Sequence, residues 1–314
     1  YDDAVGALGD ANTNWQDEIY RTAFSQDHGV TVAGSVGEIL PYRVSVGYTG
    51  QQGILKTSDF KRTTASVSLS PSLFDNHLNI NLNLKGMYAD TQYANTGAIG
   101  AAVAMDPTKP IYSSDGKYTN FGGYYEWIMD GNSLNDPTWP YAYNNQATAN
   151  PVALLNLHND RAHSKDFVGN IDVDYKVHGF EDLRLHVTAG ADIATGKQLL
   201  DESPAYPSRD GVYYGNHGWE KIDKNSYTMS GYAQYYHDFN DKAMNHFDIM
   251  LGSEYQRFVR STHNYYYGYY PETNNDKTLA GTIYKAKGKD YDGDGTIDPY
   301  YDPTENRLLS FFGR

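Results

Sequence analysis

Three stretches of the chain alternate apolar and polar residues with a period of two: Leu78-Asn-Ile-Asn-Leu-Asn-Leu84, Ile171-Asp-Val-Asp-Tyr175 and Leu183-Arg-Leu-His-Val187. Successive side chains of a β-strand point to opposite faces of the sheet. Each stretch therefore predicts a strand with one apolar and one polar face, and this pattern limits the chain to folds built from such strands.

The connections between the predicted strands fall into two classes. Short connections cover residues 70–77, 178–182 and 237–246, whereas long ones cover about 89–164, 198–226 and 259–307. Short turns at one end of the strands and long loops at the other are typical of a bacterial outer-membrane barrel. The pattern predicts an all-β fold, an antiparallel transmembrane β-barrel with long extracellular loops.

The chain divides into a lead-in segment, residues 1–27, and a strand-rich part, residues 28–314. The lead-in is polar and contains one helix-like stretch, Trp15–Arg21. Nine strands are predicted after it, at about 28–34, 40–50, 60–70, 77–91, 164–177, 182–197, 226–239, 245–262 and 306–314.

Composition excludes several classes of protein. No run approaches the roughly 20 apolar residues of a membrane-spanning helix, although barrel strands escape this test because only alternate residues face lipid. The absence of cysteine excludes disulfides, thiol catalysis and thiolate metal sites. A formal net charge of −14 argues against a nucleic-acid partner, which requires clustered Lys and Arg.

A soluble β-sandwich is the alternative, because its strands also alternate. Three features favour the barrel: strands longer than the usual 5–6 residues, long loops without internal pattern, and aromatics at both ends of the apolar stripes. Phe247 and Tyr255 share a face eight positions apart. At about 3.4 Å per residue and a tilt near 40°, they span roughly 20 Å, close to the apolar band of a barrel.

The ends of the sequence suggest a fragment. The chain begins at Tyr1 without a signal segment, and Leu308–Arg314 resembles a strand cut in its middle. We expect an internal piece of a longer precursor, with a complete small protein as the alternative.

Eight short motifs follow one another in a characteristic order: Asn14-Trp-Gln-Asp-Glu-Ile-Tyr-Arg-Thr22, Val30–Gly34, Tyr42–Tyr48, Gly53–Thr57, Leu69–Leu73, Leu78–Gly86, Asn150–Ala153 and Tyr232–Tyr235. Each is weak alone, but together they resemble the SusC-like TonB-dependent transporters, in which the first motif leads into the barrel. The resemblance runs along nearly the whole chain.

The resemblance implies an outer-membrane barrel of about 22 strands, of which about nine are present here. It implies import of oligosaccharides, starch-type or another glycan, or of peptides in some members. It further implies two protein partners, TonB in the periplasm and a SusD-like surface lipoprotein, in addition to the outer-membrane lipid. The plug, the TonB-contacting segment and the later strands do not match any part of this sequence.

The predicted loops carry aromatic side chains suited to carbohydrate. Sugar rings stack their C–H faces on aromatic rings, while nearby Asn and Asp bind the hydroxyl groups. The alternative for each aromatic is packing between loops or against the lipoprotein. The candidate substrate-binding residues are Tyr124, Trp127, Trp139, Tyr213, Tyr214, Trp219, Tyr265, Tyr266 and Tyr267.

The segment Asp290-Tyr-Asp-Gly-Asp-Gly-Thr-Ile-Asp298 fits the first nine positions of a calcium loop. The candidate Ca²⁺ ligands are Asp290, Asp292, Asp294, Thr296 and Asp298. The twelfth position, normally a bidentate Glu, is Tyr301. An acidic, solvated turn without metal is therefore the alternative.

Catalytic motifs are not found: the sequence has no His-Glu-x-x-His, no Gly-x-Ser-x-Gly and no phosphate-binding Gly loop with Lys. Asp172, Asp174 and Asp192 are expected to point into the barrel interior. We therefore predict a transporter and no enzyme. The runner-up is a secreted, soluble glycan-binding β-sandwich module, and a glycoside hydrolase would need two carboxylates about 5–10 Å apart in a cleft.

Overall fold

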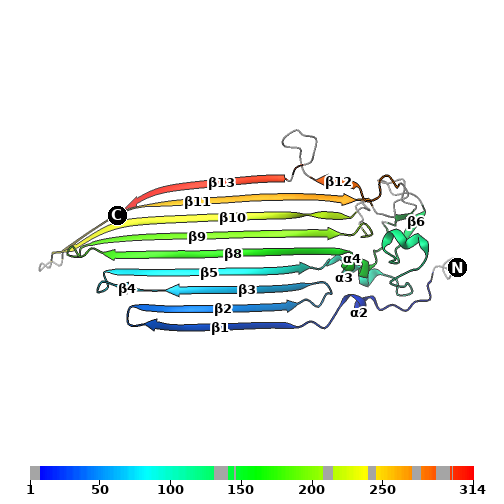
Figure 1. The fold of residues 1–314 in the computed structure, drawn as a ribbon, viewed down its shortest axis with the longest axis horizontal. Coiled ribbons are helices and arrows are strands. Elements are labelled where there is room, and N and C mark those ends of the chain that lie inside the picture. Colours follow the sequence, from blue (N-terminus) through cyan, green and yellow to red (C-terminus); the bar gives the residue numbers. More distant parts are fainter. Residues whose placement is uncertain are drawn as a thin grey trace.

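The structure, a computed structural model, describes residues 8–130, 141–144, 146–207, 215–239, 245–270, 277–287, 298 and 300–314. Most of these residues lie in one large antiparallel sheet (Figure 1). The strands of this sheet are β1 (Ser25–Val36), β2 (Leu40–Gln52), β3 (Asp59–Leu69), β4 (Ser72–Leu73), β5 (Leu78–Tyr93), β8 (His158–Lys176), β9 (Leu183–Glu202), β10 (Asn216–Asp238), β11 (His246–Tyr269), β12 (Ile283–Lys287) and β13 (Tyr300–Gly313).

The order of the strands in the sheet follows the order in the chain. Each long strand pairs with the next one, from β1 to β11, while β12 and β13 both pair with β11 and β4 pairs with β5. This simple up-and-down order is that of a barrel wall and not of a Greek-key sandwich. In the part of the chain that the structure describes, the other sheet is a two-stranded one, β6 (Ile128–Asp130) with β7 (Tyr141–Tyr143).

In the described residues, four short helices lie outside the sheet, and none of them is long and apolar enough to cross a membrane. The predicted helix-like stretch of the lead-in forms the first of them. They are α2 (Trp15–Ile19), α3 (Gly97–Ala104), the 3₁₀ helix η1 (Gly116–Phe121) and α4 (Pro151–Asn156).

The two ends of the sheet differ as the sequence predicts (Figure 1). Connections of 3 to 8 residues, 37–39, 70–77, 177–182 and 239–245, join strands at one end, the turn end. The described residues of the long connections after β5, β9 and β11 lie at the other end, the loop end, together with the short connection 53–58.

All nine predicted strands are found, but several extend further toward the loop end than predicted. The long loops are correspondingly shorter than the predicted 89–164, 198–226 and 259–307, and the second shrinks most in proportion to its predicted length, to 203–215. The prediction was wrong there because it followed apolar alternation. Beyond a membrane both faces of a strand meet water, so the strand continues without that pattern.

One face of the sheet, the apolar face, carries most of the aliphatic side chains of the long strands. The register places Val46 opposite Val30, Leu82 opposite Ile171, and Val173 opposite Val187. These side chains are uncovered: Val46 is 52% exposed and Leu251 is 64% exposed. An exposed apolar surface that continues across neighbouring strands marks contact with lipid or another protein.

Aromatic side chains border the apolar face at both ends, as barrel girdles do. On β8, β10 and β11 the two borders are eight residues apart, which corresponds to roughly 20 Å along the membrane normal. The loop-end rim consists of Tyr48, Tyr88, Phe167, Tyr227 and Tyr255, and the turn-end rim consists of Tyr42, Tyr175, Tyr235 and Phe247.

The rims also show how the strands are tilted. Tyr255 belongs to the loop-end rim on β11. The row of directly paired residues that starts at Tyr255 crosses six strand pairs and ends on β2 at Tyr42, which belongs to the turn-end rim. Each rim therefore shifts by about one residue from one strand to the next, relative to the directly paired residues. This shift corresponds to strands tilted by about 35° from the membrane normal, which lies in the range of membrane barrels. A flat soluble sheet has no reason to place its aromatics along such a diagonal.

The opposite face, the polar face, carries the polar partners of the same alternation. Asn81 pairs with Asp172, which pairs with Thr188, and Asp174 pairs with His186. Asp172, Asp174 and Asp192 share this parity, in agreement with their predicted interior position.

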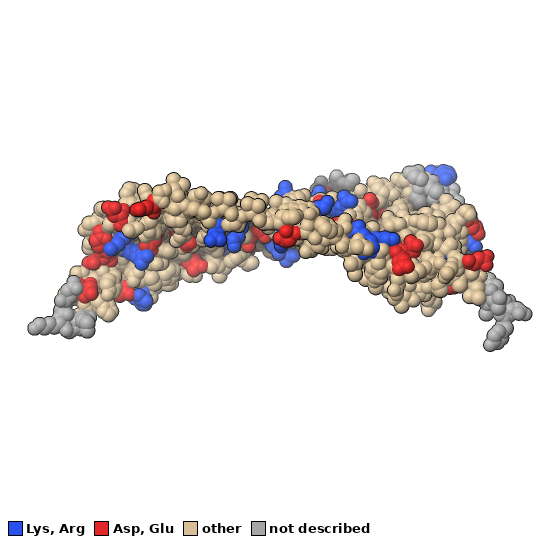
Figure 2. Space-filling model, turned by 90° about the horizontal axis from the view of Figure 1, so that it is seen from below, with Lys and Arg blue, Asp and Glu red and all other residues tan. Residues whose placement is uncertain are grey.

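The buried core of the described chain lies at the loop end. It brings together α2, α3 and α4, with Trp15, Ala98 and Leu155 each at most 3% exposed. Figure 2, an edge-on view, shows a thin middle and a thicker end where these helices lie. The α2 part of the lead-in segment thus belongs to the loop-end core, and the last residues of the segment, from Ser25, already belong to β1.

Candidate functional site

A ladder of hydrogen bonds lines the polar face near the turn end. The Thr188 hydroxyl donates to Asp172 (2.8 Å), and Arg184 Nε donates to both oxygens of Asp174 (2.7 Å each). His186 lies between them, 3.0 Å from Thr188 Oγ1 and 3.2 Å from Asp174, and stacks on Tyr232 with ring centroids 4.8 Å apart. Polar groups that satisfy one another in this way form a hydrated wall without exposing an unpaired charge.

The candidate Tyr124 is buried in the loop-end core, with 7% of its surface exposed. Its ring packs on Tyr112 at 4.8 Å, and its hydroxyl accepts a hydrogen bond from Asn156 (3.1 Å). Tyr124 therefore holds the loop together, and the packing alternative applies to it.

The candidate Trp127 belongs to a half-buried aromatic cluster. Its ring meets Tyr125 edge-on at 5.6 Å, and Lys109 Nζ lies 5.3 Å from the ring centroid. Burial raises the pKa of Tyr125 to about 12, so its hydroxyl stays protonated throughout the physiological range. This cluster can offer a ligand an aromatic edge and a cation, but its members mainly contact one another within the connection between β5 and β8.

Four candidates lie on strands, which corrects their predicted loop positions. Trp219 is on β10, and Tyr265, Tyr266 and Tyr267 are on β11. Trp219 pairs with Tyr265, and both share the parity of Tyr255 on the apolar face. Tyr267 has the same parity and packs on Tyr265 at 5.4 Å. These three rings therefore line the outer side of the wall, beyond the loop-end rim.

Tyr266 alone of this group has polar-face parity. It pairs with Gly218, where an added Cβ would lie 2.6 Å from Cδ1 of the Tyr266 ring and 2.1 Å from the Tyr265 carbonyl oxygen. A glycine is therefore required for the ring to lie across β10. Glu220 shares this face one step away, and Gln198, opposite Glu220, donates hydrogen bonds of 2.8 and 2.9 Å to Asp160. The result is an aromatic ring among carboxylates and an amide.

Several predicted residues lie outside the described part of the chain. These are the aromatics Trp139, Tyr213 and Tyr214 and the calcium-loop residues Asp290, Asp292, Asp294 and Thr296. Asp298 is described on its own. Among the described residues, no group of three or more potential metal-ligating side chains is present.

A cavity of about 530 Å³ opens between α3, α4 and the end of β9. Asn95, Glu202 and Tyr206 supply its polar atoms, and Ala101 and Leu154 supply apolar surface. Asn95 donates a hydrogen bond to the Tyr206 hydroxyl, while His158 pairs with Glu202 at 2.8 Å. The sequence did not reveal this site because its residues come from three distant segments.

Asn150 organises the loop that forms this cavity. Its side chain accepts from the backbone N–H groups of Val152 (3.0 Å) and Ala153 (3.2 Å) and donates to the carbonyl groups of Ile111 and Tyr125 (2.9 and 3.1 Å). Asn before Pro at a helix start is a recognisable capping signal, and it belongs to one of the eight motifs. No cue in the sequence identifies the two carbonyl partners.

Comparison with known proteins gives relatives of one kind. The chain is 43% identical over 311 residues to the TonB-dependent receptor SusC of Bacteroides thetaiotaomicron, covering 98% of this chain and 29% of SusC. It is 27% identical over 164 residues to the TonB-dependent receptor P26 of Formosa agariphila, covering 52% of this chain and 14% of that protein. The chain thus spans less than a third of the length of these relatives. No family model matches it.

Among solved structures, the RagAB peptide importer has a chain that matches 98% of this one, with a TM-score of 0.62 and 17% identity, and the match covers 31% of that chain. The structure of the same importer in the open-open state gives a TM-score of 0.62 at 16% identity. These matches concern the fold.

The sheet therefore has the fold of part of a β-barrel wall, as in the RagAB structures, and its sequence relatives belong to the class of TonB-dependent receptors. Within that class, this chain corresponds in sequence to a part of a SusC-like receptor. The runner-up prediction of a soluble two-sheet sandwich was wrong, because the apolar face has no second sheet over it in the described residues and its rims follow the barrel tilt.

Proposed function

We propose that the chain is a wall segment of a SusC-like transporter that imports oligosaccharides across the outer membrane. The observation that carries this proposal is the 43% identity to SusC along 98% of the chain. The proposed cargo is a starch-type or other glycan. The proposed partners are TonB, acting through parts of the transporter outside this chain, and a SusD-like surface lipoprotein at the loop end.

The polar face supports a carbohydrate cargo. Tyr266 offers a ring for stacking, and Glu220, Gln198 and Asp160 offer hydrogen-bonding groups on the same face. A sugar ring needs this combination, because its faces are apolar and its edges carry hydroxyl groups. The hydrogen-bonded ladder further along the same face continues the polar path toward the turn end.

A test uses the full-length parent with its lipoprotein partner in outer membranes. We expect Tyr266→Ala to weaken oligosaccharide binding two- to tenfold, since an aromatic stacking contact contributes about 0.5–1.5 kcal/mol. Tyr267→Ala is the matched control, because that ring lies on the opposite face. Loss of TonB should abolish uptake and leave binding unchanged. Uptake that continues without TonB would overturn the proposal.

Peptide import is the second candidate, favoured by the fold match to the RagAB peptide importer. That match has only 17% identity, so glycan import is preferred. Competition separates the two: excess peptide should leave oligosaccharide uptake unchanged, whereas displacement by peptide would favour the second candidate.

Calcium binding by residues 290–298 remains a proposal. Three Asp residues at alternate positions repel one another unless a hard cation neutralises them. Isothermal titration of the parent with Ca²⁺ should give one site that is lost in Asp292→Asn, and an unchanged isotherm would contradict it.

A further inference from the structure

A group of cations stands on the apolar face just beyond the loop-end rim. Lys61 of β3 and Arg161 and Lys165 of β8 are exposed there and share the parity of the lipid-facing residues. Lys165 pairs directly with Tyr88 of the rim, and Lys61 lies two residues from Thr63, the neighbour of Tyr48. We call these three residues the basic group.

Anionic side chains do not balance the basic group. Asp90 lies between Lys61 and His163 in the register, and its carboxylate is 3.6 Å from His163 Nδ1. Asp59, the other nearby acid, pairs with Arg21 at 3.4 Å. Within the described residues, no ion pair involves a member of the basic group. Three cations without an ion pair, gathered on one face of β3 and β8 with β5 between them, are unusual in a chain with a net charge of −14.

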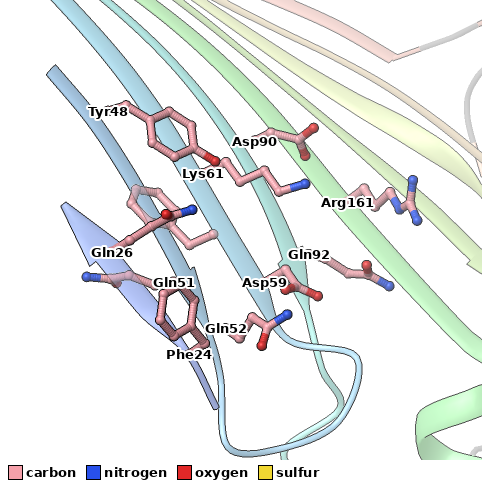
Figure 3. A pocket seen from close by; sticks show the side chains of 12 residues that line it. Phe24, Gln26, Tyr48, Gln51, Gln52, Asp59, Lys61, Asp90, Gln92 and Arg161 are labelled. Carbon is pink, nitrogen blue, oxygen red and sulfur yellow. The ribbon is translucent and has the colours of Figure 1, made fainter. Parts of the chain in front are cut away.

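Two members of this group, Lys61 and Arg161, line a groove of about 290 Å³ that crosses β1, β2, β3, β5 and β8. Figure 3 shows Lys61, Asp90 and Arg161 on the same side of the neighbouring strands, with Tyr48 at one end of the groove and Gln92 below. The groove walls are mainly polar, although the groove lies on the face that is apolar further toward the turn end. It therefore suits a polar headgroup whose chains continue along the apolar face.

We propose that the basic group binds the phosphate of a lipid headgroup in the outer leaflet. The position fits: the loop end faces the exterior, and aromatic rims mark the level at which hydrocarbon gives way to headgroups. The chemistry fits as well, because Arg binds phosphate through paired N–H groups and Lys supplies point charges. Bound phosphate would neutralise cations that otherwise repel one another. The proposal rests on membrane location and is independent of the transported cargo.

The test compares lipid binding by variants of the full-length parent, purified from outer membranes and stripped of lipid. The probes are lipopolysaccharide and the same material after enzymatic removal of its phosphates. We expect Lys61→Gln/Arg161→Gln/Lys165→Gln to bind the phosphorylated probe at least tenfold more weakly, since each cation near a lipid phosphate contributes roughly fivefold. Wild type should prefer the phosphorylated probe, and the triple variant should not.

The matched control removes the same charge from the polar face, as Arg43→Gln/Lys85→Gln/Lys224→Gln. It should bind both probes as wild type does. The charge-preserving variant Lys61→Arg/Lys165→Arg should also keep the preference, which guards against an effect of misfolding. Equal losses in both triple variants, binding that ignores phosphate, or equally tight binding of inorganic phosphate alone would each overturn the proposal.

Discussion

The loop-end core and the apolar face use the same kinds of side chain, but protein covers only the first. Leu155 of α4 is 1% exposed, whereas Leu251 of β11 is 64% exposed. Both are leucines in regular secondary structure. The difference shows that the loop end folds around its own interior, while the sheet requires a nonpolar environment from outside the chain.

The comparison also separates two stabilising effects. In the core, tight packing around Leu155 and Ala153 stabilises the fold, so truncating one of these side chains leaves a cavity that lowers the free energy of unfolding. On the apolar face, lipid chains adapt to any apolar shape, so size matters little and charge matters greatly.

The largest expected effect is in the core. Leu155→Ala should destabilise the loop end by about 2–5 kcal/mol, the usual cost of truncating a buried leucine. Amide hydrogen exchange of residues 94–130 and 146–157 measures this loss of stability. Val103→Ala is the control, because Val103 on α3 is 71% exposed. Equal exchange in the two variants would show that the core does not hold the loop.

A charge in the middle of the apolar face comes next. Ile171 lies midway between Phe167 and Tyr175, so Ile171→Arg should cost about 2–4 kcal/mol, as Arg does at the midplane of a barrel. Asn170→Arg, one residue away on the polar face, should cost little. Unfolding of the full-length parent in vesicles compares them, and equal costs would contradict the assignment of faces.

Asn150→Ala should destabilise the loop end by about 1–3 kcal/mol, because it removes a helix cap and the hydrogen bond to the Tyr125 carbonyl, while the Ile111 carbonyl still accepts from the Tyr125 N–H (3.0 Å). Thr96→Ala is the matched control, since Thr96 occupies the cap position of α3 without a side-chain cap hydrogen bond. Protease resistance of the loop end distinguishes the two variants. A loss as large in the control would refute the capping role.

The smallest effect concerns the turn end and depends on pH. His77 places its ring nitrogens 2.7 Å from the Phe74 carbonyl and 2.7 Å from Glu181, and the hydrogen bond with Glu181 raises the pKa of His77 above 6.5. The same bond holds the pKa of Glu181 below 4.5. The His77 contribution is complete below about pH 6.5 and fades as pH rises through its folded pKa, whereas the Glu181 contribution is complete above about pH 4.5 and fades as pH falls.

The pair therefore stabilises the turn end most between these two values. NMR titration should show the pKa of His77 returning toward 6.5 in Glu181→Gln. It should rise in Lys176→Gln, because the Lys176 charge lowers it. A pKa of His77 that is the same in all three proteins would refute the interaction.

The sequence predicts the sheet well because strand alternation is a local property. Residues 78–84 and 171–175 alternate without exception, and both lie within strands, β5 and β8. The inward position of Asp172 and Asp174 follows from the same parity.

Sequence reasoning fails where alternation stops. The strand positions of Trp219 and Tyr265–Tyr267 were missed because neither face of these strand ends is distinctly apolar. The burial of Tyr124 and the cavity beside Tyr206 depend on contacts between distant segments, which no local pattern encodes. The basic group escaped notice because Lys61 and Arg161 come together only through the register of three strands.

Contact of the apolar face with lipid is tested most directly by spin labels placed along β8. Residues 1–314 contain no cysteine, so once any cysteines in the rest of the full-length parent are replaced, single cysteines at positions 167–175 can each carry one label. Accessibility to oxygen, which partitions into lipid, should be high at odd positions and low at even ones, and accessibility to a water-soluble nickel chelate should show the reverse. Odd positions shielded from both reagents would mean that protein covers this face, and would contradict the account.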